Sequence, residues 1–305
     1  MVVGLPIDQI IGGSVIIGLG VFGSMVNITV IVMMLKLSIN RHAFGYICVI
    51  HLIADTYELL ISIFWSGPAT IIGLNANFTG SFVGARIGQL ILFFWYMSLY
   101  SNLQMAINRF VAITWPMSYR LYFTGRRLVL FNGFFWVLSF LHSVVYWWRD
   151  CEYYFDATKF SWVYRGQSCE YIASFYLVFV HGVVTCAVIV VINTATFVSI
   201  KRGMRMLQGK RNSIEEMRLV RRNIRLYVQG CLTASTAILA MISYQIAAVF
   251  ASERIHIMLV TVTNWQLAHT VDGFIMLTLN SSLRSFFSKT VLRRNVRTVT
   301  STAVF

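Results

Sequence analysis

Ionisable and amide side chains stand inside long apolar stretches of this chain, and these are the residues that could do chemistry. Asp55 lies in the apolar run Leu52-Ile-Ala-Asp55, and Asn27 and Asp272 lie in apolar runs near the two ends of the sequence. A carboxylate in such surroundings needs partners, which a second acid, an amide, trapped water or a cation can supply. We expect Asn27, Asp55 and Asp272 to form a polar network that rearranges, with Glu58, one helical turn after Asp55, as a further member. The alternatives are a static polar knot between helices, or a protonated Asp55.

The histidines do not have the spacing of a metal or catalytic site. Zinc hydrolases place two histidines one helical turn apart, and no His-x-x-x-His occurs here. The nearest pairing, His269-Thr-Val-Asp272, is isolated, and Ser-His-Asp and phosphate-binding patterns are also missing. We therefore expect no metal, no cofactor and no enzymatic activity, which argues against a membrane hydrolase. Single helix-interface residues are the interpretation for His51, His142, His181, His256 and His269.

A long apolar and aromatic run, Leu90 to Tyr100, is followed by a single basic residue, Arg109. Burying an arginine in lipid costs at least ~2.5 kcal/mol on insertion scales. Arg109 must therefore lie at a membrane face or inside a helix bundle. An arginine at the inner end of a spanning helix, followed by a loop with Pro116, indicates a membrane receptor that hands a signal to a cytoplasmic partner.

The composition supports a membrane protein. The chain has 305 residues, of which 57% are hydrophobic and only 12% are charged. Soluble proteins carry about 25% charged residues, so lipid must be the solvent for much of this surface. The net charge of +14 does not indicate nucleic acid, because the basic residues are segregated along the chain.

Seven stretches are long enough to cross a bilayer, which takes roughly 20 apolar residues in a helix. The predicted fold is an all-α membrane protein, a seven-transmembrane helix bundle that forms one domain over residues 1–305. The predicted helices cover residues 10–35, 44–66, 82–114, 128–148, 171–200, 224–250 and 257–279.

The basic residues set the orientation of the bundle. Most of the 25 lysines and arginines fall at one set of helix ends, and most acids fall at the other. Because cytoplasmic loops carry the excess of basic residues, the N-terminus is predicted outside and the C-terminus inside. The basic segment Lys201 to Arg225 could face a G protein or anionic lipids, or could reflect topology alone. After the seventh helix, Leu283, Phe286 and Phe287 predict a short amphipathic helix on the membrane.

Several motifs resemble rhodopsin-like G-protein-coupled receptors. The segment Asp272 to Arg284 is similar to the end of helix 7 and the start of helix 8 in that superfamily. Asn27, Asp55 and Trp136 resemble its helix 1 asparagine, helix 2 aspartate and helix 4 tryptophan. More narrowly, Asn108-Arg109-Phe110 with its surroundings, Ile107 to Tyr119, and Phe44-Gly45-Tyr46 resemble the nematode serpentine chemoreceptors, class x most of all.

This resemblance implies a chemosensory receptor for an odorant-like small molecule. It implies a heterotrimeric G protein as the partner, with Asn108, Arg109 and Phe110 in coupling, and it adds Asn280 to the polar network of Asn27, Asp55 and Asp272. The expected location is the plasma membrane, as a multi-pass protein in contact with its lipids, with sensory cilia implied by the resemblance. The rival function is a seven-helix channel or transporter, which would favour inverted repeats and broken helices that the sequence does not show.

The sequence departs from the superfamily at several positions. Asn108 replaces the acid that usually holds the arginine in the resting state, and Gly273 and Met276 replace a proline and a tyrosine of helix 7. The predicted helices 171–200 and 224–250 contain no proline. Bends at those positions must come from Gly or Ser or be absent, which puts the familiar swing of helix 6 in doubt.

The outer half of the bundle is the expected ligand pocket. Trp95 and Tyr96 lie three to four helical turns before Arg109, on the route from the outer face. Apolar walls with few polar groups suit a small-molecule pocket, although aromatic residues also serve helix packing. The further pocket candidates are Gln89, Leu92, Trp265 and Gln266.

The second outer loop holds two cysteines. The superfamily's usual bridge would need a cysteine near Gly84, and none is there. Cys151 and Cys169 both face an oxidising compartment, so we expect them to pair with each other and close a hairpin. Asn77-Phe78-Thr79 is a candidate glycosylation site in another outer loop.

Overall fold

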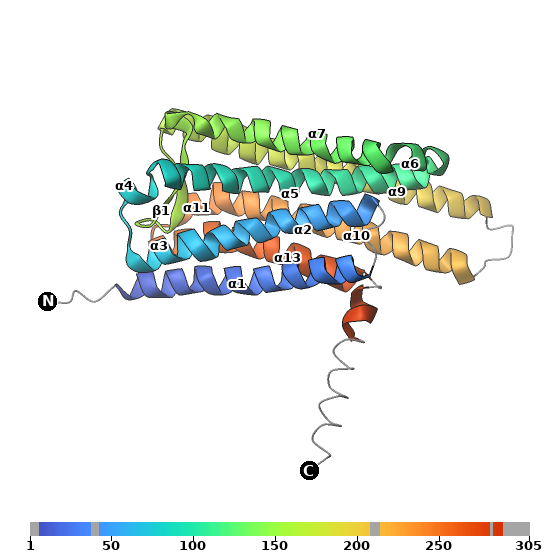
Figure 1. The fold of residues 1–305 in the computed structure, drawn as a ribbon, viewed down its shortest axis with the longest axis horizontal. Helices are drawn as coiled ribbons and strands as arrows, with labels where there is room; N and C mark the ends of the chain where they lie inside the picture. Colours follow the sequence, from blue (N-terminus) through green and yellow to red (C-terminus); the bar gives the residue numbers. More distant parts are fainter. Residues whose placement is uncertain (1–5, 38–42, 208–213, 281–282, 289–305) are drawn as a thin grey trace, which may run out of the picture.

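The computed structural model describes residues 6–37, 43–207, 214–280 and 283–288, while only the backbone is described for most of 203–223. Long helices lie side by side and form an elongated bundle (Figure 1). The first three are α1 (Ile7–Lys36), α2 (Ala43–Ile61) and α5 (Phe82–Thr114). Next come α7 (Gly125–Val144), α9 (His181–Leu207), α10 (Ile214–Ile242) and α13 (Asn264–Leu279).

Shorter segments extend these helices. A π-helical turn, η2 (Ser62–Ser66), and α3 (Gly67–Ile72) prolong α2, and η3 (Val145–Trp147) prolongs α7. Before α9 come α8 (Gln167–Glu170) and η5 (Tyr171–Val180), and after α10 come η6 (Ser243–Ala247) and α11 (Ala248–Phe250). Before α13 come α12 (Arg254–Met258) and η7 (Leu259–Thr263). The connections hold α4 (Ala76–Thr79), α6 (Pro116–Tyr122) and η4 (Arg149–Cys151).

Within the described ranges, six helical segments are long and apolar enough to cross a membrane. They are Ile7–Lys36, Ala43–Ile72, Phe82–Thr114, Gly125–Trp147, Gln167–Arg202 and Ile224–Ile246. The predicted seventh span corresponds to the helical segment Arg254–Leu279, which is not among them. This segment carries many polar residues, such as Gln266, His269 and Asp272, and they lower its mean hydropathy.

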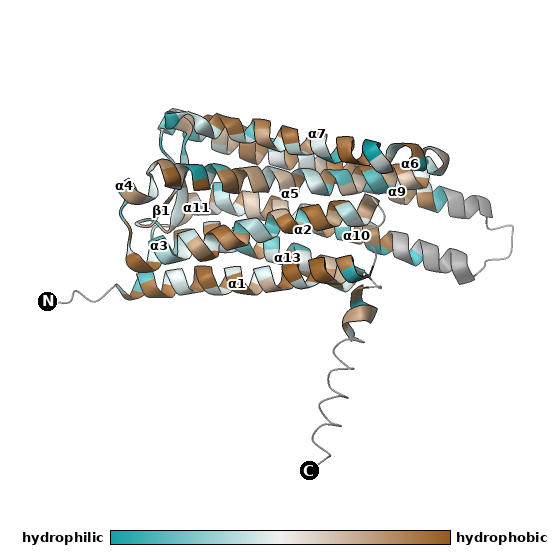
Figure 2. Ribbon diagram, in the orientation of Figure 1, coloured by the Kyte–Doolittle hydropathy of each residue, from teal (hydrophilic) through white to brown (hydrophobic). Residues whose placement is uncertain are grey.

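The distribution of side chains in α7 is the reverse of that in a soluble protein. Its buried residues include Asn132, Ser139 and Ser143, whereas Phe134 and Phe140 are exposed. Hydrophobic residues recur along the length of the long helices (Figure 2). A polar inner face and an apolar outer face are what a lipid solvent requires.

A β-hairpin covers the end of the bundle at which α1 begins (Figure 1). Strands β1 (Tyr153–Asp156) and β2 (Ser161–Tyr164) are antiparallel, with Tyr153 opposite Tyr164. The expected disulfide Cys151–Cys169 closes the loop that holds them. The mostly helical fold therefore includes this short β-hairpin, in which Phe155 of β1 and Phe160 of the turn are buried. We call this end of the bundle the hairpin end and the opposite one the Arg109 end.

Helices α1 and α13 approach each other closely at Gly273. A Cβ atom there would overlap the Asn27 side chain and lie 3.1 Å from Val26. Any larger residue at position 273 would have to displace the Asn27 side chain, and the chain has a glycine where the resemblance leads one to expect a proline. Residues 283–288, in the predicted amphipathic segment, are helical, with Leu283 buried against the bundle and Phe287 exposed.

Candidate functional site: a buried ion-pair chain between a cavity and Arg109

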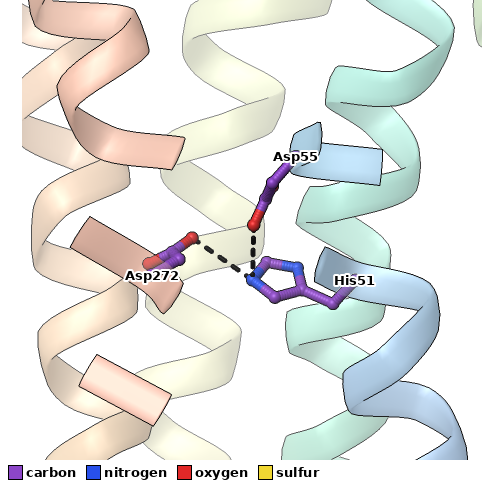
Figure 3. A group of neighbouring side chains, drawn as sticks. All are labelled: His51, Asp55 and Asp272. Atoms are coloured by element: carbon purple, nitrogen blue, oxygen red, sulfur yellow. Dashed lines mark ion pairs between the residues drawn. The ribbon is translucent and has the colours of Figure 1, made fainter. Parts of the chain in front are cut away.

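The centre of the bundle holds two aspartates that share one histidine (Figure 3). His51 and Asp55 stand one turn apart on α2, and Asp272 faces them from α13. The Nε2 atom of His51 lies 3.3 Å from Asp55 Oδ2 and 3.2 Å from Asp272 Oδ2. The Ser98 hydroxyl donates to Asp55 Oδ1 at 2.7 Å. All of these side chains are buried, so the helices α2, α5 and α13 are joined here by interactions that water does not screen.

A second histidine extends this group toward the hairpin end. His269 Nδ1 lies 2.8 Å from Asp55 Oδ1, and its Nε2 lies 2.9 Å from Glu58 Oε2. The Trp265 indole N–H donates to the same Glu58 oxygen at 2.8 Å. We call Asp272, His51, Asp55, His269 and Glu58 the ion-pair chain. It alternates acids and imidazoles from Asp272 to Glu58.

The structure brings together part of the predicted polar network. Asp55 and Asp272 meet through His51, and the Asn27 amide donates to the backbone carbonyl of His269 at 3.2 Å. Asn280 is not part of the ion-pair chain. It lies at the end of α13, where its Oδ1 accepts from the Leu283 N–H at 3.4 Å. Glu58, expected as a further member, ends the chain.

The interpretation of the histidines as single interface residues is wrong for four of them. His51 and His269 belong to the ion-pair chain, while His142 and His181 flank the Tyr100 hydroxyl at 3.2 and 3.0 Å. The sequence holds a signal for His51, which precedes Asp55 by four residues, a spacing that places the two on one helix face. It holds none for His269, which pairs with Asp55 and Glu58 of another helix and not with Asp272 three residues later.

The same atoms could hold a small cation. One ligand atom each from His51, Asp55 and Asp272 lie within 4.8 Å of one another. A protonated His51 that bridges both carboxylates meets the same distances. That this protein binds no metal stays a prediction.

A cavity lies between the ion-pair chain and the hairpin. Glu58 and His269 line it, together with residues from α5, the hairpin and the segment Arg254–Leu279. Side chains nearly fill it, and the space open to the centre of a water-sized sphere is about 30 Å³. Four of the predicted pocket residues line this cavity: Leu92, Trp95, Trp265 and Gln266.

The structure places the other two pocket candidates elsewhere. The Gln89 amide donates to the Ser143 carbonyl of α7 at 2.9 Å, and the Tyr96 hydroxyl donates to the Leu177 carbonyl at 3.1 Å. Each residue turns a helix by ~100°, so Tyr96 lies about 100° and Gln89 about 120° around α5 from Trp95. Gln89 and Tyr96 therefore lie on other sides of α5 than Trp95, and depth in the membrane alone does not identify the residues that line the cavity.

Sequence reasoning missed the aromatic residues that close the cavity from the hairpin end. Tyr153 and Trp162 come from the two strands, and Tyr244 comes from η6. The Tyr153 and Tyr244 hydroxyls lie 3.2 Å apart, and the latter donates to the Trp162 carbonyl at 2.9 Å. The two cysteines predicted the hairpin, but nothing in the sequence shows which strand residues turn toward the helices.

Arg109 lies at the other end of the bundle. It is 6% exposed and donates through Nη1 to the Leu226 carbonyl of α10 at 2.6 Å. Its guanidinium also lies over the Phe44 ring, 4.8 Å from the centroid. The neighbouring Asn108 does not hold it, because its amide donates to the Tyr119 hydroxyl of α6 at 3.3 Å. Phe110 is half-buried with its ring edge against Trp115.

The glycosylation candidate lies at the hairpin end. Asn77 is exposed in α4, while Thr79 is buried and its hydroxyl bonds the Asn75 carbonyl at 3.3 Å. Of the basic segment Lys201 to Arg225, the described backbone at residues 201–207 and 214–225 belongs to the Arg109 end (Figure 1), and the side chains of residues 203–220 are outside the described part of the structure.

Comparison with known proteins agrees with this arrangement. Residues 17–280 match the family described as serpentine type 7TM GPCR chemoreceptor Srx. The chain is similar to Serpentine receptor class X 45 of Caenorhabditis elegans, with 25% identity over 271 residues that cover 82% of this chain and 73% of that protein. The family is one of receptors. The chain belongs to the serpentine type 7TM GPCR chemoreceptor Srx family.

Proposed function

We propose that this protein is a G-protein-coupled chemoreceptor that detects a small molecule at the hairpin end and engages a heterotrimeric G protein at the Arg109 end. The observation that carries the proposal is the ion-pair chain, which begins at the cavity with Glu58 and reaches the middle of the bundle at Asp272. A ligand that contacts Glu58 changes the electrostatics of groups that join α2, α5 and α13. Such a link lets binding at one end alter helix packing further along the bundle.

The orientation in the membrane is part of the proposal. The disulfide and the exposed Asn77 belong to the hairpin end, and Arg109 belongs to the other end, as do the described residues 201–207 and 214–225 of the basic segment. Disulfides persist in oxidising compartments, and basic residues favour the cytoplasmic side. The hairpin end and the N-terminus therefore face outward, in a multi-pass protein of the plasma membrane, with sensory cilia as the expected site.

The segment Arg254–Leu279 is the seventh span of this proposal. Its part α13 packs against α1, α2 and α10, and Gln266, His269 and Asp272 are buried there. Its polar residues therefore point into the bundle and not toward lipid. A helix whose polar side is covered by its neighbours can cross a membrane at lower mean hydropathy than one that is exposed to lipid.

Signalling follows from the contact between Arg109 and α10. Arg109 can meet a cytoplasmic partner only when it leaves the Leu226 carbonyl, so this contact favours the resting bundle. A ligand that binds the open bundle more tightly shifts the population toward it, and a G protein does the same from the other side. Asn108 and Phe110 act beside Arg109, by positioning α6 and by packing on Trp115.

A channel or transporter is not favoured. The matched family is one of receptors, and this argues both against a transporter and against enzymatic activity. The described helices are interrupted only by π-helical turns such as η2 and η7, not by the unwound segments that transporters use for their substrates.

Nucleotide exchange tests the function. Cell membranes that contain the receptor are combined with a panel of heterotrimeric G proteins, with and without mixtures of volatile and water-soluble small molecules. At least one G protein should exchange GDP for GTP faster with the receptor present, and a mixture should change that rate. No response from any G protein, together with solute or ion flux through vesicles that hold the protein, would replace the proposal with the transporter.

A further inference from the structure

The cavity contains a carboxylate whose bonding is incomplete. Glu58 Oε2 has the Trp265 N–H and the His269 ring as neighbours, but Oε1 is buried without a hydrogen-bond partner. The Glu58 side chain is 2% exposed and lines the cavity. Leaving a buried carboxylate oxygen unpaired is costly, so a donor in the cavity would be stabilised there.

The ion-pair chain also lacks positive charge. It contains three carboxylates, those of Asp55, Glu58 and Asp272, and two imidazoles. Even with both rings protonated, ionised carboxylates leave one negative charge unbalanced. Among the described residues, those two rings are the only basic groups within ion-pair distance of the three carboxylates. One added positive charge would make the group neutral.

The walls of the cavity suit a cation. Trp95 and Trp265 lie with ring centroids 4.3 Å apart, and Tyr153 and Trp162 stack at 5.5 Å. All four line the cavity with Glu58. Aromatic rings that line a cavity together with a carboxylate favour an organic ammonium ion, because the ring quadrupole attracts a positive charge that reaches a ring face.

The size of the cavity limits what it can take. The space of about 30 Å³ for the centre of a water-sized sphere leaves room for a ligand of only a few non-hydrogen atoms. A larger amine could enter only if the hairpin residues Tyr153 and Trp162 moved. The same size is a poor match for a long fatty acid or a sugar, and an anion would face Glu58.

We propose that the cavity binds a small organic ammonium ion, whose N–H or methyl groups meet Glu58 and whose alkyl part contacts Trp95 and Trp265. This inference rests on the proposed function, since it names the chemical class of ligand for that receptor. Binding neutralises the ion-pair chain at its Glu58 end. A neutral chain no longer needs the same sharing of protons among Asp55, His269 and Asp272, so the ammonium changes how strongly α2 and α13 are held.

Ligand binding to the purified full-length receptor in lipid nanodiscs tests the proposal without any G protein. Trimethylammonium is titrated at neutral pH while tryptophan fluorescence and thermal unfolding are followed. The control ligand is tert-butyl alcohol, which has a similar shape and no charge. Trimethylammonium should bind saturably and raise the unfolding temperature, and tert-butyl alcohol should bind at least tenfold more weakly.

Two variants locate the site. Glu58→Gln keeps the size of the side chain and an acceptor for Trp265 but removes the charge, so affinity for trimethylammonium should fall by roughly tenfold or more. Asp8→Asn makes the same chemical change at a partly exposed carboxylate that pairs with Arg254, and should bind as the wild type does. If Glu58→Gln does not fold, Trp95→Leu provides the second test. It removes an aromatic wall and should weaken ammonium binding severalfold without affecting tert-butyl alcohol.

Three results would overturn the proposal: no saturable ammonium binding to the wild type, equal affinity for tert-butyl alcohol, or unchanged ammonium affinity in the folded variant. A proton then fills the place of the cation on Glu58. Ammonium binding with no nucleotide exchange on any G protein would keep this site and refute the proposed signalling. Exchange without ammonium binding would do the opposite.

Discussion

The replacement Asn108→Asp should lower signalling in the absence of ligand. Arg109 is held in the closed bundle by a neutral carbonyl, that of Leu226, and Asn108 bonds Tyr119 instead of the guanidinium. An aspartate at position 108, which is 2% exposed, would put a buried negative charge on the residue next to Arg109, and its attraction for the guanidinium should favour the closed bundle. In the open bundle, where Arg109 meets water or a partner, that charge is worth less because solvent screens it.

The magnitude follows from the type of bond. A charge-assisted hydrogen bond is roughly twice as strong as a neutral one, which amounts to about 1 kcal/mol in favour of the closed bundle. A difference of 1.4 kcal/mol is tenfold in population, so about 1 kcal/mol should lower ligand-free exchange roughly fivefold. It follows that the wild type should show appreciable basal exchange.

Basal nucleotide exchange is compared at matched surface density for the wild type, Asn108→Asp and Tyr119→Phe. The tyrosine variant removes the Asn108 bond and keeps the ring that stacks on Phe123 at 5.2 Å, without any change of charge. It should leave basal exchange within about twofold of the wild type, since a neutral hydrogen bond contributes little net free energy. Equal or higher exchange in Asn108→Asp would refute the reasoning, because a charge beside Arg109 would then not restrain the switch. A decrease of the same size in Tyr119→Phe would assign the effect to α6 instead.

Three further changes test the packing and the orientation. Gly273→Ala should lower the thermal midpoint of the receptor in lipid, since overpacking costs about 1–3 kcal/mol, whereas Gly18→Ala, with no atom within 4 Å of the new Cβ, should not. Serine in place of both Cys151 and Cys169 should destabilise the hairpin by about 3 kcal/mol, because the disulfide closes a loop with a sequence separation of 18 residues. Amide exchange in both strands should become faster. Unchanged exchange would mean that contacts with the helices alone hold the hairpin. Asn77 should carry a glycan in the expressed receptor, which would lower its mobility on a gel. Treatment with a glycosidase and the variant Asn77→Gln should each abolish that shift. No shift in the wild type would refute this site.

The sequence was most informative where one physical requirement dominates. A span must hide some 20 residues of backbone in lipid, so the apolar runs were visible, and the helix expected at 82–114 has the same limits as α5. The segment Arg254–Leu279 is recognisable from its motif but is not among the six helical segments of the described chain that are long and apolar enough to cross a membrane, because it carries polar residues that point inward. Paired cysteines in one loop identified the disulfide, since the described part of the chain has no other cysteine beside them at the hairpin end.

The site was harder to predict because it depends on contacts between distant residues. The acids Asp55 and Asp272 were recognisable from their apolar surroundings, but their partners were not: His269 bonds Asp55, which lies 214 residues away, and not the nearby Asp272. Trp95 lines the cavity and Tyr96 does not, because neighbouring residues on a helix face different directions at nearly the same depth in the membrane. Strand residues such as Trp162 enter the cavity only once the hairpin has folded onto the helices.

Receptor-dependent release of GDP tests most directly whether the Arg109 end activates a G protein. The direct measurement uses purified receptor in lipid nanodiscs with one heterotrimer that responds to it, and follows release of bound GDP for the wild type, Arg109→Ala and Arg149→Ala. Arg149 is an exposed arginine at the hairpin end and serves as the control for loss of one positive charge. Arg109→Ala should abolish receptor-dependent release of GDP from the G protein, while the thermal midpoint of the variant stays within a few degrees of the wild type. Arg149→Ala should stimulate GDP release as the wild type does. Unchanged GDP release with Arg109→Ala would show that this arginine does not couple the receptor to the G protein.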